Sequence, residues 1–522
     1  MVRRLPRIGL WAALVLLYAW PALLNGAPFF FPDTSHYIRA ADAAVVSLTG
    51  HRSSWSDRLL EAPSAPAANA SGPDAASPPG ADPALATATA IPPQIRPART
   101  VLTGRSIYYG AFLYAGLEGL GRFGPVIFQS AIAVGTVALF LFGATASLTP
   151  GRRQRWIWGG LIAVGLLSPL PFFVSRLMPG AFTGPLILAF VSLILFGAHY
   201  GRLARTFLFM VAAAAITFHI SHILLILSVG GGALLLNLGQ RQGWTLRLLL
   251  PTSLILIAIA AQMLFSAAVT RTLGAPPTAP PFLSARLIAE GPGYRYLETH
   301  CSPPKFLLCG YRDRMPQPSD IMLWSEDPHE GIFSTLGEDS KRQLGGEDVR
   351  FYLAVLREYP GEVIGSIIRS SGEQALAFDL DHFNYVAEHR EGARSHLPPE
   401  IFVWVERSAA YRGTVPVAPT IIVTIAVTLL SLILLAAGFA SRTGRASWRS
   451  PGAAAALLIL LALAANVVIC GGMSTPHARY LMRIVWLLPL AVIAFAAAMP
   501  RRRGDHQHVP VSDAPPALER TA

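Results

Sequence analysis

The sequence predicts an all-α, polytopic membrane protein with about ten transmembrane helices. Three observations support this fold class. Of the 522 residues, 52% are hydrophobic and only 14% are charged, whereas soluble globular proteins carry roughly 25% charged residues. The apolar residues gather in runs that are long enough to cross a bilayer, at about 20 residues each. The short loops between these runs carry arginine, and they fall on one side, as the positive-inside rule expects for cytoplasmic loops.

The net charge of +12 comes largely from these short arginine clusters. Because the clusters stand between apolar runs and no nucleic-acid-binding motif accompanies them, they are interpreted as cytoplasmic loop anchors. The membrane is therefore an expected partner, and no nucleic acid is expected.

The predicted spans follow one another along the chain. The first run, 8–24, is interpreted as a retained helix and not as a cleaved signal peptide, because 22–27 offers no convincing cleavage site. The stretch 207–238 is too long for one span and too short for two ordinary ones, so it is divided at the polar sequence 218–222. The full set is 8–24, 125–148, 156–174, 182–200, two short helices within 207–238, 248–269, 418–440, 453–470 and 480–499.

The polar segments define the expected domains. Residues 1–270 form a transmembrane core with juxtamembrane helices in its first outer loop, where 62–98 is a disordered insertion rich in Ala, Pro, Ser and Gly. Residues 271–415 form a small, mainly helical extracytoplasmic domain, and 416–500 hold the last spans. Residues 501–522 are expected to be a disordered tail. This arrangement places the protein in the inner (cytoplasmic) membrane with both termini in the cytoplasm.

Two of the three cysteines, Cys301 and Cys309, lie in the polar segment 271–415. A disulfide that closes a small loop is permitted there if the segment is outside the cytoplasm. The alternative is two unrelated thiols, because spacing alone does not fix the geometry of a disulfide.

An ionisable cluster directly follows the first span. Asp33, His36 and Arg39 are spaced by three and share one side of any helix that begins there. Asp33 is either the N-cap of the helix expected from residue 37 to residue 48 or a working group. Since Thr34 or Ser35 could supply a cap, a catalytic role for Asp33 is predicted. His36 is either part of the same site or a residue of the membrane interface.

The predicted topology brings further polar residues to the same outer side, where ionisable groups at membrane depth are costly and usually functional. Arg105 and Tyr109, one turn apart, either contact a phosphate or serve as snorkelling anchors. Arg479 and Arg483 form a two-pronged cationic strip suited to a lipid-linked phosphate, with snorkelling as the alternative. The predicted substrate-binding set is His36, Arg105, Tyr109, Arg176, His219, His222, His477, Arg479 and Arg483.

His219 and His222 lie three apart within an apolar run. Two histidines at this spacing can bind a metal, but a pair without a third ligand is not a complete site. The prediction is therefore that they line a polar cavity. No metal ligands are assigned, and a divalent metal remains only a possible cofactor.

The pattern resembles the GT-C superfamily of polyprenyl-phosphate-dependent glycosyltransferases, which includes enzymes that use dolichyl-phosphate-mannose or transfer aminoarabinose. Residues 32–37 (PDTSHY) stand where that family carries an acid after its first span, and 105–113 are similar to the segment that ends its first outer loop. Residues 125–148 match its second span. Residues 175–180 resemble a turn that often carries a second acid, but Gly180 stands in that place here. Residues 475–489 resemble a late Arg-Tyr-bearing span of some GT-C-like bacterial proteins.

The resemblance implies transfer of a hexosyl or pentosyl group from a lipid-linked sugar donor to an acceptor outside the cytoplasm. Asp33 would be the general base that draws the proton from the acceptor hydroxyl. Arg105, Arg479 and Arg483 would stabilise the departing phosphate. The acceptor, whether glycan, lipid or protein, is not indicated.

Three other functions stay open. A ligase or polymerase of surface polysaccharide would carry its essential groups in 271–415 instead of at Asp33. A transporter is disfavoured because no repeat is found and the charges gather near one membrane surface. A non-catalytic assembly factor would tolerate loss of Asp33, Arg105 or Arg479.

Overall fold

The computed structural model describes residues 5–56, 101–236 and 244–499. Throughout these ranges the protein is all-α, and β-structure is limited to two isolated bridges, Phe29 to Arg176 and Leu102 to Thr278. The predicted insertion at 62–98 and the predicted tail at 501–522 lie outside the described residues.

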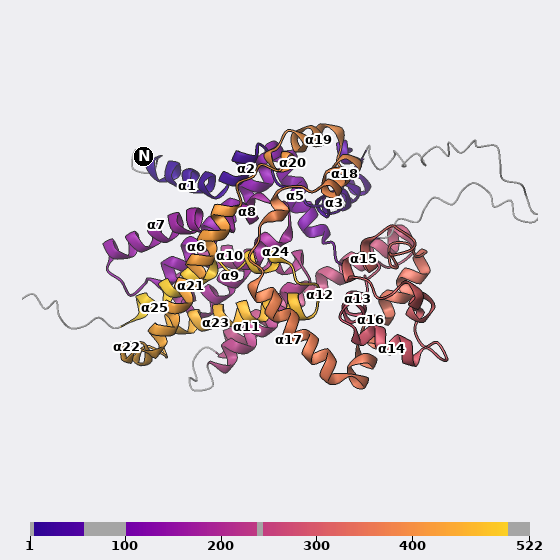
Figure 1. Cartoon of the computed structure of the whole chain (residues 1–522). Helices are drawn as coiled ribbons and strands as arrows, with labels where there is room; N and C mark the ends of the chain where they lie inside the picture. Colours follow the sequence, from indigo (N-terminus) through magenta and orange to yellow (C-terminus); the bar gives the residue numbers. More distant parts are fainter. Residues whose placement is uncertain (1–4, 57–100, 237–243, 500–522) are drawn as a thin grey trace, which may run out of the picture.

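Six segments of the described chain are long and apolar enough to cross a membrane, which indicates a multi-pass membrane protein. They are Ile107–Ala144, Pro179–His199, Thr245–Leu273, Ala418–Ala440, Pro451–Gly472 and Ala478–Ala498. Two shorter apolar helices cover Gly9–Tyr18 and Ser221–Leu235. In Figure 1 many of these helices lie side by side in one layered body.

The first half of the chain supplies several helices of this body and others that pack on it. They are α1 (Leu5–Tyr18), α2 (Trp20–Asn25), α3 (Thr34–Thr49), α5 (Ile107–Leu120), α6 (Gly124–Ala144), α7 (Pro150–Leu167), α8 (Leu170–Ser175), η3 (Pro179–Phe182), α9 (Thr183–Phe196), α10 (Arg202–Phe218), α11 (Ser221–Leu235) and α12 (Trp244–Leu273).

Two of the predicted spans are each split into two helices. The run 8–24 is divided between α1 and α2, where Pro21 occupies the first turn of α2. The run 156–174 is divided between α7 and α8, where Ser168 is extended and Pro169 precedes α8. Proline cannot donate the backbone hydrogen bond of a helix interior, so it begins a new helix at each place.

The predicted break in 207–238 is confirmed. α10 ends at Phe218, His219 is extended (φ −150°, ψ 130°), and α11 begins at Ser221. The helix α5 folds back on α6 through Gly121, whose φ of 67° favours glycine. Gly116 and Gly124 let the two helices touch, since a Cβ on Gly124 would lie 1.9 Å from the Gly116 carbonyl oxygen.

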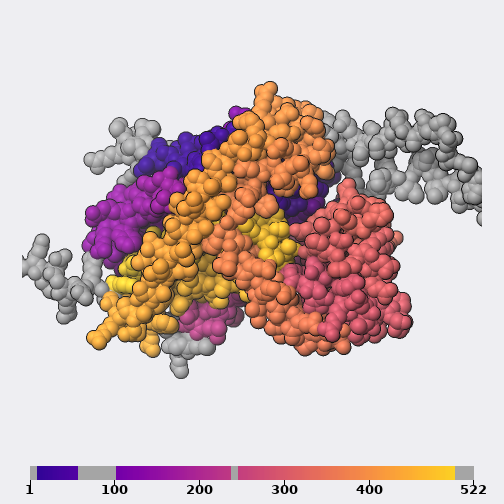
Figure 2. All heavy atoms as spheres, in the orientation of Figure 1, coloured from indigo at the N-terminus to yellow at the C-terminus, as the bar shows by residue number. Residues whose placement is uncertain are grey.

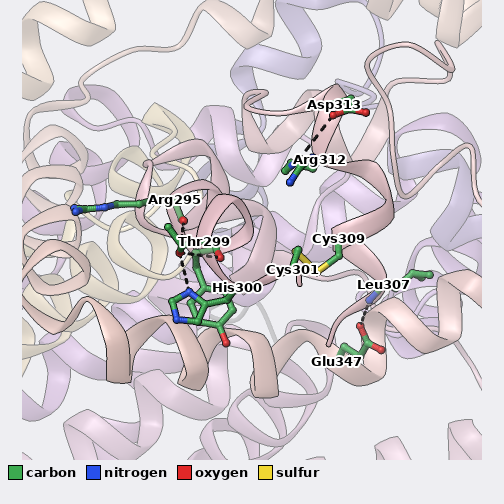
Figure 3. Close-up of a disulfide and its surroundings, with 10 residues drawn as sticks. Arg295, Thr299, His300, Cys301, Leu307, Cys309, Arg312, Asp313 and Glu347 are labelled. Carbon is green, nitrogen blue, oxygen red and sulfur yellow. Dashed lines mark hydrogen bonds and ion pairs between the residues drawn. A yellow bond between two sulfur atoms is a disulfide. The ribbon is translucent and has the colours of Figure 1, made fainter. Parts of the chain in front are cut away.

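The polar region 271–415 divides into two parts, which differs from the single domain predicted. Five helices share a separate hydrophobic core: α13 (Phe282–Ala289), α14 (Pro292–His300), α15 (Ser319–Trp324), α16 (Glu338–Glu358) and the first half of α17 (Pro360–Leu376). The Asp348 carboxylate on α16 accepts from the backbone of Ser284 at 2.7 Å, which ties α16 to the start of α13. Cys301 and Cys309 form a disulfide that closes the loop between α14 and η5 (Leu307–Arg314) (Figure 3).

The other part, α18 (Ala387–His396), α19 (Pro399–Glu406) and α20 (Ala409–Arg412), packs on the N-terminal helices instead. The Phe383 ring sits against Phe29 and Phe172, with centroids 4.9 and 5.0 Å away. The backbone of Ala410 donates to the Asn25 side chain at 2.7 Å. Burial of these aromatic rings stabilises this packing, so the second part of 271–415 joins the main core and not the core of α13–α17.

The chain ends in α21 (Ala418–Ala440), α22 (Arg442–Ala446), α23 (Pro451–Val467), η7 (Val468–Gly472), α24 (Ala478–Met482) and α25 (Leu487–Ala498). Figure 2 shows that the surface is hollowed between the upper orange segment and the red α13–α16 bundle. The indigo N-terminal part and the yellow C-terminal part of the chain are visible within this hollow.

Candidate functional site

Asp33 occupies the N-cap position of α3 but makes no capping hydrogen bond within the described region. Its carboxylate instead lies 2.9 Å from the guanidinium of Arg105, with the two side chains 32% and 21% exposed. Thr34 uses its hydroxyl to accept from Phe31 and to donate to the carbonyl of Leu177. The acid is therefore held by a distant cation and stays accessible.

Arg105 links Asp33 to a small pocket of about 70 Å³. The pocket is bounded by residues 103–108, by the break between α10 and α11, and by α12. Its polar lining consists of Thr103, Arg105, Ser106, Tyr108, Thr217, His219 and Gln262. Sites for drug-sized ligands are about 300–1,000 Å³, so this pocket can take only a small group.

A second feature of the site is a buried guanidinium without an acidic partner. Arg176 is 2% exposed, and across the described chain its Nε and Nη2 atoms find no hydrogen-bond partner. Its guanidinium carbon lies 3.8 Å from the ring centre of Phe383 and 5.4 Å from that of Phe31. Aromatic faces attract a cation, but they do not neutralise its charge.

Arg479 approaches the same aromatic ring. Its guanidinium carbon lies 4.9 Å from the centre of Phe31 and 5.1 Å from that of Tyr480. The Phe31 ring is therefore flanked by the guanidinium groups of Arg176 and Arg479. An uncompensated buried cation is costly unless it is paired, so this arrangement is suited to an anion.

Three histidines lie around this aromatic–cationic cluster. The ring of His382 is 6.5 Å from Phe31, 6.3 Å from His389 and 6.4 Å from His477. Burial, and then the charges of Arg176 and Arg479, lower the pKa of His382 to about 4. Burial and Arg176 lower the pKa of His389 as well. Burial and the nearby arginines thus disfavour the charged form of both rings.

His477 ties the site to the bundle of α13–α16. Its Nε2 lies 3.2 Å from the carboxylate of Asp320 on α15, and hydrogen bonding to His477 lowers the pKa of that carboxyl. The Gln374 side chain accepts from the backbone N–H of His477 and donates to its carbonyl, both at 2.9 Å. Arg479 follows two residues later, so these contacts position it.

Three charged groups of the site, Asp33, Arg105 and Arg479, affect the pKa of the Tyr37 hydroxyl. Burial and the Asp33 carboxylate raise the pKa of Tyr37, whereas Arg105 and Arg479 act in the opposite direction. Asp33, Arg105 and Arg479 therefore all lie within electrostatic reach of the Tyr37 hydroxyl.

Three of the predicted substrate-binding residues are buried and hydrogen-bonded to neighbouring elements. Tyr109 is fully buried and donates to Gln129 at 2.9 Å. His222 has both ring nitrogens engaged, with Thr183 at 2.9 Å and the carbonyl of Ala215 at 2.6 Å.

The third is Arg483, which is 4% exposed and donates to Asn466 at 2.8 Å and Cys470 at 3.2 Å. Its guanidinium carbon lies 5.0 Å from the ring centre of Tyr480, which Arg479 also approaches, but only Arg479 reaches Phe31 as well. A sequence shows helical spacing but not the polar side chain that a neighbouring helix supplies.

The other two predicted histidines lie at the margin of the site. His219 lines the pocket at the helix break, and its Nδ1 lies 2.8 Å from the Ser221 hydroxyl. His36 packs against His396 at 5.9 Å, and its buried Nδ1 finds no partner among the described residues. Burial, and then Arg105, lower the pKa of His36 to about 4.

Sequence reasoning missed Phe31 as a contact, and it missed Asp320, His382 and His389 altogether. A usable signal was the run 379–385 (DLDHFNY), which is unusually rich in acids and aromatics for a loop. Asn466 was a second signal, because a polar side chain inside an apolar span usually has a specific partner.

No three His, Cys, Asp or Glu residues are grouped closely enough to hold a metal ion in the part of the chain that the structure describes. No family model, curated protein or solved structure matches the chain. Conclusions about function therefore depend on the geometry of the site.

Proposed function

We propose that the protein is a GT-C-like glycosyltransferase of the inner membrane, which transfers a sugar from a polyprenyl-phosphate donor to an acceptor on the outer side. The proposal includes a topology of ten spans with both termini in the cytoplasm. This number counts the split helices and the shorter helices as spans. Its main support is the position of Asp33. The Asp33 side chain makes no capping hydrogen bond to α3 in the described chain, and it pairs with Arg105, which lines a pocket.

In this proposal the Asp33 carboxylate takes the proton of the acceptor hydroxyl. A bond forms between that oxygen and the anomeric carbon of the sugar, and the bond from the anomeric carbon to the phosphate oxygen breaks. The electron pair leaves with the polyprenyl phosphate. Arg105 orients Asp33, and it borders the pocket that would receive part of the sugar or acceptor.

Arg176 and Arg479 are the proposed seat for the phosphate. Arg176 is buried without a carboxylate partner among the described residues, and both guanidinium groups flank Phe31. Guanidinium groups offer forked donors to phosphate oxygens, and their charge offsets the charge that builds on the leaving group. Arg176 thus takes the role that the sequence suggested for Arg483.

The test is release of polyprenyl phosphate by the full-length protein in nanodiscs, supplied with a panel of polyprenyl-phosphate sugars and an extract of source-cell envelopes as acceptor. The wild type is expected to consume at least one donor, and Asp33→Asn to be about 10²–10⁴-fold slower. Asp313→Asn is the matched control, because that side chain is 97% exposed in the polar bundle. Equal rates for Asp33→Asn and wild type would overturn the proposal.

A second candidate is a surface-polysaccharide ligase, which also uses a lipid-linked donor. The observation that favours it is the arrival of His382 and Asp320, both from 271–415, at the same cluster. In a ligase, His382→Gln would abolish transfer while Asp33→Asn would retain it. The same release assay therefore separates the two functions.

A further inference from the structure

The helix α17 has three distinct faces when its residues are placed at about 100° per residue. One face is buried and consists of Val363, Ser366, Ile367, Ser370 and Gln374. A second face is charged and consists of Glu362, Arg369 and Glu373. The third face spans about 120° of the helix circumference.

This third face is exposed and contains no polar side chain. It consists of Gly361, Ile364, Gly365, Ile368, Gly372, Ala375 and Leu376. Ile364, Ile368 and Leu376 are 53%, 67% and 79% exposed. An exposed isoleucine by itself is ordinary, but an uninterrupted apolar stripe on an amphipathic helix needs a partner.

The buried face fixes α17 to the end of a membrane span. It packs on η7, the last turns of the apolar segment Pro451–Gly472. The contact is close, because a Cβ on Gly471 would lie 2.6 Å from the Gln374 Cβ and 2.8 Å from the Ser370 carbonyl oxygen. A helix held against the end of a span lies at the depth of the membrane surface.

The charged face turns toward the polar bundle. Arg369 pairs with Glu290 at 2.8 Å, and Glu362 pairs with Arg295. In Figure 1, α17 extends from the body of spans to the bundle of α13–α16. The apolar face is thus left on the side that the bundle does not cover.

We propose that α17 lies in the plane of the outer leaflet and places Ile364, Ile368 and Leu376 in the boundary between lipid headgroups and acyl chains. The partner is the lipid surface itself. An apolar stripe bordered by charges is typical of interfacial helices. The proposal does not depend on glycosyl transfer.

The test is the depth of nitroxide labels on the full-length protein in nanodiscs of phosphatidylglycerol and phosphatidylethanolamine. Single substitutions Ile364→Cys and Ile368→Cys probe the apolar face, and Glu373→Cys is the matched control on the charged face. Ile422→Cys, on an exposed position of the span Ala418–Ala440, gives the value for lipid. The parent protein sets the background, because Cys470 is buried and the other two cysteines are bonded.

Power-saturation electron paramagnetic resonance compares collisions of each label with oxygen, which concentrates in lipid, and with a water-soluble nickel chelate. The oxygen-to-nickel ratio at 364 and 368 is expected to be several-fold higher than at 373 and to approach that at 422. A ratio at 368 no higher than at 373 would overturn the proposal. Because all four positions are exposed, none of these substitutions removes a packing contact that folding requires.

Discussion

The Asp33 carboxylate and the Arg105 guanidinium lie 2.9 Å apart, although the two residues are far apart in the sequence. Both side chains are partly exposed, and an ion pair of this kind adds only about 0–1 kcal/mol to stability. Its importance is expected to lie in positioning the acid.

Replacement of either member of this pair should affect transfer in a non-additive way. Asp33→Asn is expected to slow polyprenyl phosphate release by about 10²–10⁴-fold. Arg105→Gln should have a smaller effect, and the double variant should be no slower than Asp33→Asn, because Arg105 acts through that carboxylate. Release rates of the four proteins in nanodiscs provide the measurement. Two effects that simply multiply would show that Arg105 acts independently of Asp33.

Arg176→Met should abolish stabilisation by a bound phosphate group. The guanidinium is buried without a carboxylate in the described chain, so an anion that binds the native state stabilises it, by about 2.7 kcal/mol at a hundred times the dissociation constant. Thermal unfolding with and without pyrophosphate measures the effect. Arg153→Met is a fair control, because Arg153 also covers an aromatic ring, that of Phe142, at 3.6 Å. Equal stabilisation of wild type and Arg176→Met would place the anion elsewhere.

The stability of the protein should fall as the pH is lowered from about 6.5 to about 4. The pKa of His36 is about 4 in the folded protein, below its usual value of 6.5, because burial and Arg105 disfavour its charged form. The unfolded chain therefore binds more protons in this window, so stability is complete above pH 6.5 and is lost toward pH 4. One such histidine contributes at most about 3 kcal/mol.

Unfolding midpoints between pH 4 and pH 7.5 test this expectation. His36→Asn should show a smaller loss on acidification than wild type, whereas His51→Asn, at an exposed position after α3, should behave as wild type. The expectation fails if His36→Asn and wild type lose the same stability over this range.

Gly471→Ala should destabilise the junction between α17 and η7. The added Cβ would lie 2.6 Å from the Gln374 Cβ, so α17 must move, and overpacking of this kind costs about 1–3 kcal/mol. Gly365→Ala is the matched control on the same helix, since a Cβ there meets nothing within 4 Å. Hydrogen exchange at residues 473–480 should rise in Gly471→Ala alone. Unchanged exchange there would show that α17 does not position the segment that carries His477 and Arg479.

The sequence was sufficient to predict the helical class and the break at residues 218–222, because both follow from local composition. Hydrophobic runs identify membrane helices, and a polar pentapeptide within an apolar run marks where a helix ends. Asp33, Arg105 and Arg479 could be named because ionisable groups at membrane boundaries are few.

The remaining features depend on contacts between segments that are distant in the chain. Tyr109 and His222 were predicted as site residues. In the structure, Tyr109 is hydrogen-bonded to Gln129, and His222 is hydrogen-bonded to Thr183. His382 reaches the site only because Phe383 packs among aromatic rings of the first helices. The division of 271–415 has the same origin. The spacing of residues in the sequence does not predict such long-range packing.

The most direct test of the proposed site is a cryo-electron microscopy map of the protein in nanodiscs with a polyprenyl-phosphonate sugar that cannot be transferred. The phosphonate is expected between Arg176 and Arg479 beside Phe31, with the anomeric carbon facing the Asp33 carboxylate. Density for the phosphonate away from both arginines, or a sugar on the far side of the protein from Asp33, would contradict the proposed function.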